Sequence, residues 1–422
     1  MVNSSSWMYT ILPISAISGG LSVILPLYIL LLKGTVFDVA MAITLFELIS
    51  IPASLLWGDL TDKLDKTKLF ILISIIGLFP VLIIFYLLEF VPVIETFYGI
   101  YAFIATASSP AINILIMSNR RSRTLPRYFS RYSVLAIIGS LAGMLPGLFI
   151  GDGFVKQYLL ILLLINVISL VMAVFLINAD KRTPKKDHAK TVKKSFAILN
   201  MLSKTPYILT GHALIDRIHS GMKDSKKRNI YVLLTAIALF NAGLYLFNSS
   251  YIPYLSEHSI NYTGIFAINI INNAAQLGVY VLVLSFISKI MLERSYRIST
   301  LARGASYIMA VMPLFIVQRY FFSLNLLSYL VSGLAYALWN ISSSVLLYTE
   351  IKNMHKGHYI GLWTAILGLS AVIGAFLSGI ISSTIGYVET FASATVIIFC
   401  SFIVFERFEN AKKYASNKYR YT

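Results

Sequence analysis

The sequence predicts an all-α polytopic membrane protein with twelve transmembrane helices arranged as two six-helix bundles. Hydrophobic residues make up 57% of the 422 positions and charged residues only 13%. The mean hydropathy of +0.76 is higher than a soluble chain of this length reaches. Apolar runs of about 20 residues, the length that crosses a bilayer, recur along the chain. One long basic stretch divides these runs six and six.

The first bundle is expected over residues 1–179 and the second over residues 229–405. The first six spans are predicted at 8–32, 36–57, 69–89, 96–117, 131–151 and 157–179. The second six are predicted at 229–255, 262–288, 300–318, 322–347, 359–382 and 387–405. A basic cytoplasmic linker at 180–228, with thirteen Lys and Arg, separates the bundles, and a cytoplasmic tail follows at 406–422. A solvated linker with short interfacial helices is favoured over a regulatory segment.

The formal net charge of +17 is distributed as in a membrane protein. All but three of the 35 Lys and Arg fall on one side of the predicted spans, and the exceptions are Lys33, Lys156 and Arg319. Such a bias is the positive-inside rule, and it places both termini in the cytoplasm of a plasma membrane. Contact with anionic lipid headgroups explains the basic pI, so no nucleic acid partner is expected.

Several classes of site are not expected. Cys400 is the single cysteine, which rules out a disulfide within the chain and a thiolate metal cluster. No P-loop and no HExxH motif occurs, and His355 and His358 read as two solvated side chains rather than metal ligands. The N-terminus lacks the basic region of a signal peptide. We expect no cofactor, no metal and no enzymatic activity.

The two halves read as weak copies of one another. The segment 136–151 aligns with 365–380 at an offset of 229, and the same offset lays span 2 on span 8 and span 4 on span 10. Parallel repeats about an axis along the membrane normal are a recurrent transporter design, with the substrate held between the halves.

Charge is concentrated between spans 2 and 3, in the stretch GDLTDKLDKTK from Gly58 to Lys68. This stretch resembles the signature loop of the major facilitator superfamily, G-x-L-x-D-[RK]-x-G-[RK]-x-[RK]. The matching residues are Gly58, Leu60, Asp62, Lys63, Lys66 and Lys68, and Asp65 replaces the second glycine. Together with twelve spans and the central linker, the resemblance covers the whole chain.

The resemblance implies a conformational gate at this loop. Gly58 would allow close helix approach, and Asp62 would lie at the positive N-terminal end of span 11, near Tyr359. Lys63, Lys66 and Lys68 complete the candidate gating set. These contacts would form when the cytoplasmic side is closed; the alternative is that the charges only hold the loop in water. The corresponding loop at 288–297 has lost the aspartate and the glycine.

Small residues recur at four-residue spacing in span 5. Gly139, Gly143 and Gly147, with Pro146, form a series that lets membrane helices pack backbone to backbone. The series loosely resembles the G-x-x-x-G-P-x-x-G-G signature of the drug exporter branch, with the proline displaced. Plain helix packing is the alternative.

Glu47 is the strongest candidate for a coupling residue. It is the only ionisable residue near the centre of a predicted span, and no Lys or Arg is predicted at a similar depth. A carboxyl group there must be protonated, paired or facing water. Proton coupling or substrate contact is favoured over a satisfied structural carboxylate.

Amide side chains outline the rest of the candidate cavity. In span 8 four amides follow i, i+3, i+4 and i+7 spacing, which places them on one helical face. Because amides that face lipid are costly, we expect this face to contact protein or water. The candidate substrate residues are Asn113, Asn241, Tyr245, Asn248, Asn269, Asn272, Asn273, Gln276 and Asn340. The alternative for each single residue is an interhelical hydrogen bond without a ligand.

The predicted function is secondary active transport of a small organic solute by alternating access. Proton coupling through Glu47 and export, as in multidrug efflux antiporters, are favoured; uptake of a neutral polar nutrient and a facilitator are alternatives. A cavity without fixed positive charge argues against phosphate, nitrate or dicarboxylate. The expected partners are the substrate, protons and lipid, and the expected state is a monomer. A transporter-like membrane sensor is the alternative of another class.

Overall fold

The computed structural model describes residues 6–64, 66–117, 125–149, 151, 154–177, 228–286, 292–315, 318–351 and 356–418. In these ranges the chain is helical, and strands do not occur. The linker predicted at 180–228 falls, apart from Arg228, outside the described residues. So do the first five residues and the last four.

The first half contains six spans. They are α1 (Ile11–Leu31) with the preceding turn η1 (Ser6–Thr10), α2 (Val36–Leu64), α3 (Thr67–Leu87), α4 (Val91–Thr106) with α5 (Ser108–Met117), α6 (Leu125–Met144) with η2 (Leu145–Leu148), and α7 (Val155–Leu176). Pro92 opens α4 within its first turn, where its missing N–H costs nothing.

The second half repeats the pattern. Its spans are α10 (Arg228–Glu257), α11 (Tyr262–Phe286), α12 (Leu292–Val311) with η4 (Met312–Leu314), α13 (Phe321–Glu350) preceded by η5 (Gln318–Tyr320), α14 (Lys356–Thr384) and α15 (Tyr387–Lys418). Eleven spans of the described chain are long and apolar enough to cross a membrane by length and composition. The twelfth is α12, which is the least apolar of the twelve because polar and charged residues occur along most of its length. The predicted fold class of twelve helices in two bundles is confirmed.

Two predicted boundaries are wrong in an informative way. The hydropathy pattern predicts the ninth span at 300–318, yet α12 begins at Leu292, because its first turns carry Glu293, Arg294 and Arg297 and resemble a loop. The charged stretch after Trp57 is likewise predicted as a loop, yet α2 continues as a helix to Leu64. In both places a helix extends beyond the apolar run, where headgroups and water can solvate its charges. The tail predicted from residue 406 is wrong in the same way, because α15 continues as a helix to Lys418.

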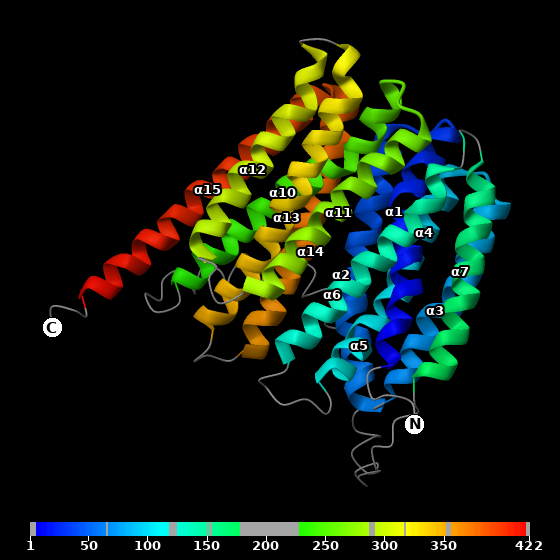
Figure 1. Ribbon diagram of the computed structural model, residues 1–422, viewed down its shortest axis with the longest axis horizontal. Helices are drawn as coiled ribbons and strands as arrows, with labels where there is room; N and C mark the ends of the chain where they lie inside the picture. The colour runs from blue at the N-terminus through cyan, green and yellow to red at the C-terminus, as the bar shows by residue number, and fades with distance from the viewer. Residues whose placement is uncertain are drawn as a thin grey trace, which may run out of the picture.

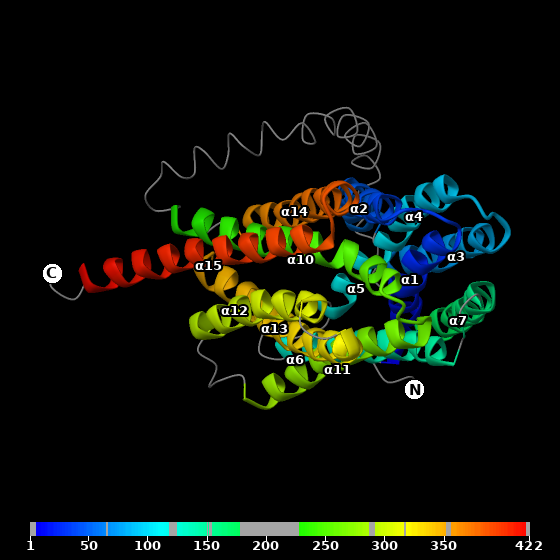
Figure 2. The same cartoon turned by 90° about the horizontal axis from the view of Figure 1, so that it is seen from above.

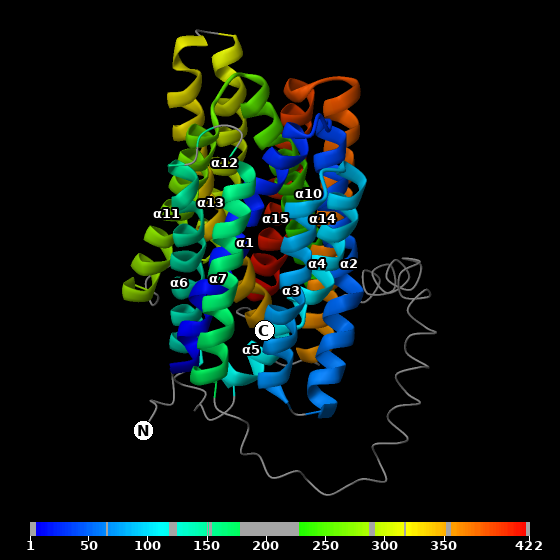
Figure 3. The same cartoon turned by 90° about the vertical axis from the view of Figure 1, so that its right-hand side faces the viewer.

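The two halves are related by a pseudo-twofold pattern of helix pairs (Figure 2). In the first half α1 packs on α6, α2 on α4, and α3 on α7. In the second half α10 packs on α14, α11 on α13, and α12 on α15. Each pair maps onto its counterpart by span number, so the repeat that is weak in sequence is plain in packing. Figure 3 views the first half in front of the second.

The repeat is also seen in the contacts of one basic residue in each half. The Lys68 ammonium donates to the Val174 carbonyl at 2.7 Å and ties the start of α3 to the end of α7. Arg297, at the offset of 229, ties the start of α12 to the end of α15 by ion pairs with Glu406 (2.7 Å) and Glu409. The signature-like loops thus brace span 3 to span 6 and span 9 to span 12.

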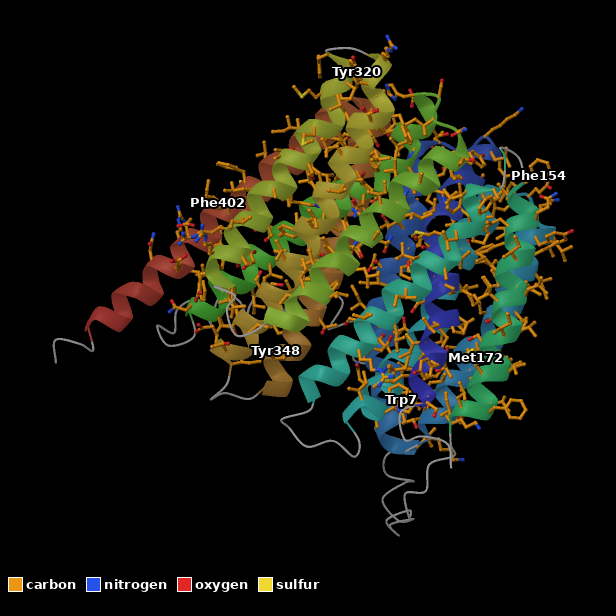
Figure 4. The ribbon with its side chains drawn as sticks, in the orientation of Figure 1. Trp7, Phe154, Met172, Tyr320, Tyr348 and Phe402 are labelled. Carbon is orange, nitrogen blue, oxygen red and sulfur yellow. The ribbon has the colours of Figure 1, made fainter. Side chains whose placement is uncertain are left out.

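The ends of the helices define two sides. We call the side that contains both chain ends the terminal side and the other the far side (Figure 1). Trp7 and Tyr348 lie toward the terminal side, and Phe154 and Tyr320 lie toward the far side (Figure 4). Aromatic residues at both levels are typical of the two membrane interfaces. Between these levels large apolar side chains such as Leu164, Phe175 and Val396 are exposed, as lipid-facing residues are.

The two halves meet mainly toward the far side. A Cβ on Gly147 would meet the Phe266 ring, and one on Gly379 would meet Phe37 and Ala40. Tyr262 reaches the Leu27 carbonyl at 3.5 Å. Toward the terminal side α12 and α15 lean away from α1 and α7 (Figure 1). The structure is therefore closed on the far side.

Candidate functional site

Glu47 lies on α2 at the interface between the two halves. The Tyr245 hydroxyl of α10 donates a hydrogen bond to Glu47 Oε1 at 2.7 Å. Glu47 is half-buried, so its carboxyl group is neither in bulk water nor sealed in a core. A hydrogen bond to a carboxylate contributes about 1.5–3 kcal/mol, and this one joins α2 to α10. The sequence identifies both residues but not their pairing.

Aromatic rings lie close to the Glu47 position. Phe46, its neighbour on α2, packs against Tyr98 and Tyr101 of α4 with ring centroids 4.8 and 5.8 Å apart. Tyr98 and Tyr101 stack on each other at 5.8 Å. This cluster fixes the α2–α4 contact beside the carboxyl group, so the position of Glu47 is held by packing from its own half.

A buried cation corrects the expectation that Glu47 is the only charge at mid-depth. Arg303 lies near the middle of α12 and is 2% exposed. It donates to the Tyr307 hydroxyl at 2.9 Å, to the Ser332 carbonyl at 2.8 Å and to Asn248 Oδ1 at 3.2 Å. Because Asn248 is three residues after Tyr245, the guanidinium lies about one helical turn from the depth of Glu47.

The amide side chains of span 8 separate into two groups. Asn272 donates to the Tyr329 carbonyl of α13 at 2.8 Å and accepts from Gln276 at 2.7 Å, so this pair bonds within the second half. Asn273 instead faces the first half, with its amide 3.6 Å from the Met144 sulfur. Asn269 donates to its own helix at Ile265.

The remaining candidate amides are dispersed. Asn241 is buried and donates to the Leu367 carbonyl (2.8 Å) and Ser370 hydroxyl (3.0 Å) of α14, so it joins two helices of one half. Asn340 donates to the Tyr280 hydroxyl at 2.7 Å. Asn113 is exposed on α5. The structure therefore brings Glu47, Tyr245 and Asn273 to the interface between the halves and leaves Asn241 away from it.

The candidate gate lies at the terminal end of α2 and the start of α3. A Cβ on Gly58 would meet no atom of the described residues within 4 Å. The side chains of Asp62 and Lys63, and those at 356–361 where α14 begins, lie outside the described residues. Lys66 is exposed and directly precedes α3, and Lys68 binds α7 rather than the second half. For the described residues, an open space at Gly58 agrees with closure of the far side.

The glycines of α6 pack against backbone. Cβ atoms on Gly139 and Gly143 would meet the carbonyls of Leu12 and Ala16 on α1. Gly147 and Pro146 lie in η2, where the helix tightens, and Gly147 faces Phe266 of the other half. Gly139 and Gly143 thus provide the contact of α6 with α1 within the first bundle, and Gly147 provides a contact between the bundles.

Two cavities adjoin in the first half. One, of about 300 Å³, lies among α1 to α7 and is lined by serines, Thr106, Tyr101, Tyr132 and Asn166. The other, of about 320 Å³, lies between α1, α6 and Asn273. Ser15 and Ser18 line both. These hydroxyl-bearing residues are not among the candidates that the sequence provides; serine on successive spans at matching depth was the available signal.

Two six-helix bundles with polar cavities reaching their interface define the class of secondary transporters. The chain belongs to the major facilitator superfamily, whose family model, Major Facilitator Superfamily, matches residues 8–350. It is a multi-pass membrane protein and a secondary transporter of a small solute, in a family of transporters rather than enzymes.

Solved structures share this fold. The nucleoside transporter NupG superimposes with a TM-score of 0.68 at 15% identity, covering 98% of this chain and 100% of that one. Peptide transporter POT in complex with sulfate gives a TM-score of 0.70 at 13% identity, covering 97% of this chain and 95% of that one. A POT family transporter in complex with 5-aminolevulinic acid gives 0.69 at 14%, covering 96% of each chain. Curated proteins give no match.

Proposed function

We propose that this protein is a proton-coupled transporter of an uncharged polar organic solute in the plasma membrane, with both termini in the cytoplasm. The observation that carries the proposal is the Glu47–Tyr245 hydrogen bond, because it joins a carboxyl group of one half to a hydroxyl of the other. A titratable group at the moving interface is what coupling of a proton to alternating access requires.

The mechanism follows from the position of that bond. In the far-side-closed state Tyr245 stabilises the Glu47 carboxylate across the interface. Opening the far side separates α2 from α10 and α14, and the carboxylate loses its donor in a medium of low dielectric constant. An uncompensated charge there costs several kcal/mol, so a proton from the far side neutralises it. Closure restores the bond and favours release of the proton toward the terminal side.

The chemistry of the cavities supports an uncharged solute. The described residues that line them include serines, Thr106, two tyrosines and two asparagines, and they include no Lys, Arg, Asp, Glu or His. An anionic cargo would lack a counter-charge in these cavities, so phosphate, nitrate and dicarboxylates are disfavoured.

Export in exchange for protons is the direction we propose. It is supported by the resemblance of the segment from Gly139 to Gly147 to the exporter signature and by the contact of Gly147 with Phe266 on the closed far side. Uptake of a neutral polar nutrient is the second candidate, and the hydroxyl- and amide-bearing lining favours it. The fold neighbours include a nucleoside transporter and peptide transporters, which suggests compounds to test.

Flux in proteoliposomes with an imposed pH gradient tests the proposal. A compound identified by thermal-shift screening should be driven against its gradient, into the proton-rich compartment for export and out of it, together with the protons, for uptake. Glu47→Gln should retain exchange without a gradient and lose the pH dependence of net flux. Tyr245→Phe removes the donor that stabilises the carboxylate, so it should weaken coupling and shift the pH dependence.

The matched control is Glu95→Gln, because Glu95 is a half-buried carboxyl group on α4 outside the inter-half contact. It should leave the pH profile of net flux unchanged. A Glu47→Gln protein that transports with the pH profile of the parent would contradict proton coupling through this residue.

A further inference from the structure

The cavity of about 300 Å³ lies inside the first bundle rather than between the halves. Its walls come from α1, α2, α3, α4, α5, α6 and α7, and its polar residues are neutral. The volume is at the lower end for sites that hold a small organic molecule, and it would otherwise hold about ten water molecules.

Most hydroxyl groups on its walls donate to the backbone. Five of them donate to a carbonyl three or four residues earlier in the chain, at 2.6–3.2 Å: Ser18, Ser50, Ser74, Thr106 and Ser108. A hydroxyl has one proton and two lone pairs, so each of these oxygens can still accept a hydrogen bond. These five residues therefore present acceptors to the cavity, and the hydroxyl groups of Ser15, Ser109 and Tyr132 on the same walls can also donate.

Asn166 adds a buried acceptor to the same wall. It is fully buried on α7, and its amide nitrogen donates to the Ile75 carbonyl of α3 at 3.0 Å. Its Oδ1 has no hydrogen-bond partner among the described residues. Buried amide oxygens are almost always paired, so this atom requires a donor that the described protein does not supply.

Another part of the wall is aromatic. Phe46 and Tyr101 line it, with their rings 5.8 Å apart. The Tyr101 hydroxyl donates to Ser18 at 3.4 Å. Ser18 also lines the second cavity, which Asn273 of the other half borders. Ser18 therefore lies between the first cavity and the region where the two halves meet.

We propose that this cavity is a binding subsite for an uncharged, ring-bearing solute with several O–H or N–H donors, the chemistry of a nucleoside or a cyclic polyol. The donors of the solute bond the serine oxygens and, once the side chains that cover it move aside, Asn166 Oδ1. Its ring lies against Phe46 and Tyr101. An anion is disfavoured because the wall carries no cationic side chain. This inference rests on the proposed transport function and specifies what is transported.

Equilibrium binding to the purified full-length protein tests the subsite. The probes are uridine, myo-inositol and 2′,3′,5′-tri-O-methyluridine, which keeps the ring of uridine and lacks its hydroxyl donors. We expect uridine or myo-inositol to bind and to raise the melting temperature. The methylated compound should bind at least tenfold more weakly than uridine. Ser74→Ala and Ser108→Ala should each weaken binding about fivefold, the effect of one lost hydrogen bond.

Ser169→Ala is the matched control, because Ser169 is a fully buried serine on α7 that does not line the cavity. It should leave the dissociation constant unchanged. The subsite assignment is wrong if neither uridine nor myo-inositol binds, or if Ser74→Ala and Ser169→Ala have the same effect. Water alone would then occupy the cavity.

The two proposals fail separately. If binding depends on Ser74 but Glu47→Gln leaves the pH profile of flux unchanged, proton coupling through Glu47 is contradicted and the subsite is supported. If the pH profile depends on Glu47 but Ser74→Ala does not change binding, the subsite is contradicted and proton coupling is supported.

Discussion

Arg303 is a cation held by neutral oxygens. Its guanidinium donates to Tyr307, Ser332 and Asn248, and it lies 5.2 Å from the centroid of the Tyr307 ring. The planar fork of arginine reaches several acceptors at once, which a lysine ammonium cannot do. Since these acceptors come from α10, α12 and α13, Arg303 joins three helices of the second half.

Replacing Arg303 tests this role. Arg303→Lys keeps the charge but cannot reach the three acceptors together, so we expect a loss of about 2–4 kcal/mol of stability. Thermal unfolding in detergent measures it as a lower melting temperature. Arg319→Lys, an exposed arginine in η5 on the far side, should have no effect. Equal melting temperatures for both variants would contradict the role.

A functional residue can be predicted from the sequence where it is polar and its neighbours in the same span are apolar. Glu47 stands out because its neighbours are apolar, and Tyr245 is identified in the same way. Arg303 is missed because the charges at the start of α12 set the predicted span boundary too late. Pairing is also beyond the sequence: the bond between Glu47 and Tyr245 depends on how two helices 198 residues apart in the chain are placed.

At the scale of the element, α1 and α6 approach closely through glycine. Gly139 and Gly143 face the carbonyls of Leu12 and Ala16, and Tyr158 of α7 donates to the Gly143 carbonyl at 2.6 Å. A side chain at either glycine would push against backbone, which cannot yield as a flexible side chain does. The α1–α6 distance is therefore fixed by the absence of a Cβ atom.

Two identical substitutions separate packing from helix propensity. Gly143→Ala should destabilise the protein by about 1–3 kcal/mol, because the new methyl group overpacks against α1. Gly278→Ala places the same methyl group on α11, where nothing lies within 4 Å, and should be neutral or stabilise by up to about 1 kcal/mol. Melting temperatures of the two variants give the comparison; a Gly143→Ala protein as stable as Gly278→Ala would refute close packing.

Element boundaries are predictable only where apolar runs and helices coincide. The spans of α1, α3 and α13 follow their hydrophobic runs, whereas α2 and α12 continue into charged sequence. Hydropathy shows which residues can lie in lipid, whereas the length of a helix depends on its hydrogen bonds and on its packing against neighbouring helices. An apolar run and its helix can therefore end at different residues near the membrane interface. The break between α4 and α5 at Ala107 does have a signal in the sequence, because Pro110 cannot donate to the Thr106 carbonyl that a continuous helix would offer it.

At the scale of the whole molecule, closure of the far side depends on α2 with α14 and α6 with α11. Gly379 lies against Ala40, and Gly368 against Ile51. Both pairs use glycine on α14, so the helices meet with little side-chain volume between them. The halves can separate there without disturbing the core of either bundle.

Cross-linking tests this closure in a Cys400→Ser background. Ala40→Cys with Gly379→Cys should form a disulfide on oxidation, lock the far side and abolish flux until a reductant is added. Gly58→Cys with Tyr359→Cys should cross-link only when the far side opens. Flux that persists in the oxidised Ala40→Cys, Gly379→Cys protein would contradict alternating access by far-side opening, and the single-cysteine variants serve as controls.

The continuity of α2 has a mechanical consequence. Glu47 and Leu64 lie on one helix, about 25 Å apart along its axis, with Pro52 between them. Tilting a straight α2 by about 10° at Glu47 would move its terminal end by about 4 Å. Proline removes one backbone hydrogen bond, so α2 bends more easily at Pro52 than elsewhere. The stiffness of α2 at Pro52 therefore decides how much of a tilt at Glu47 reaches the terminal end of the helix.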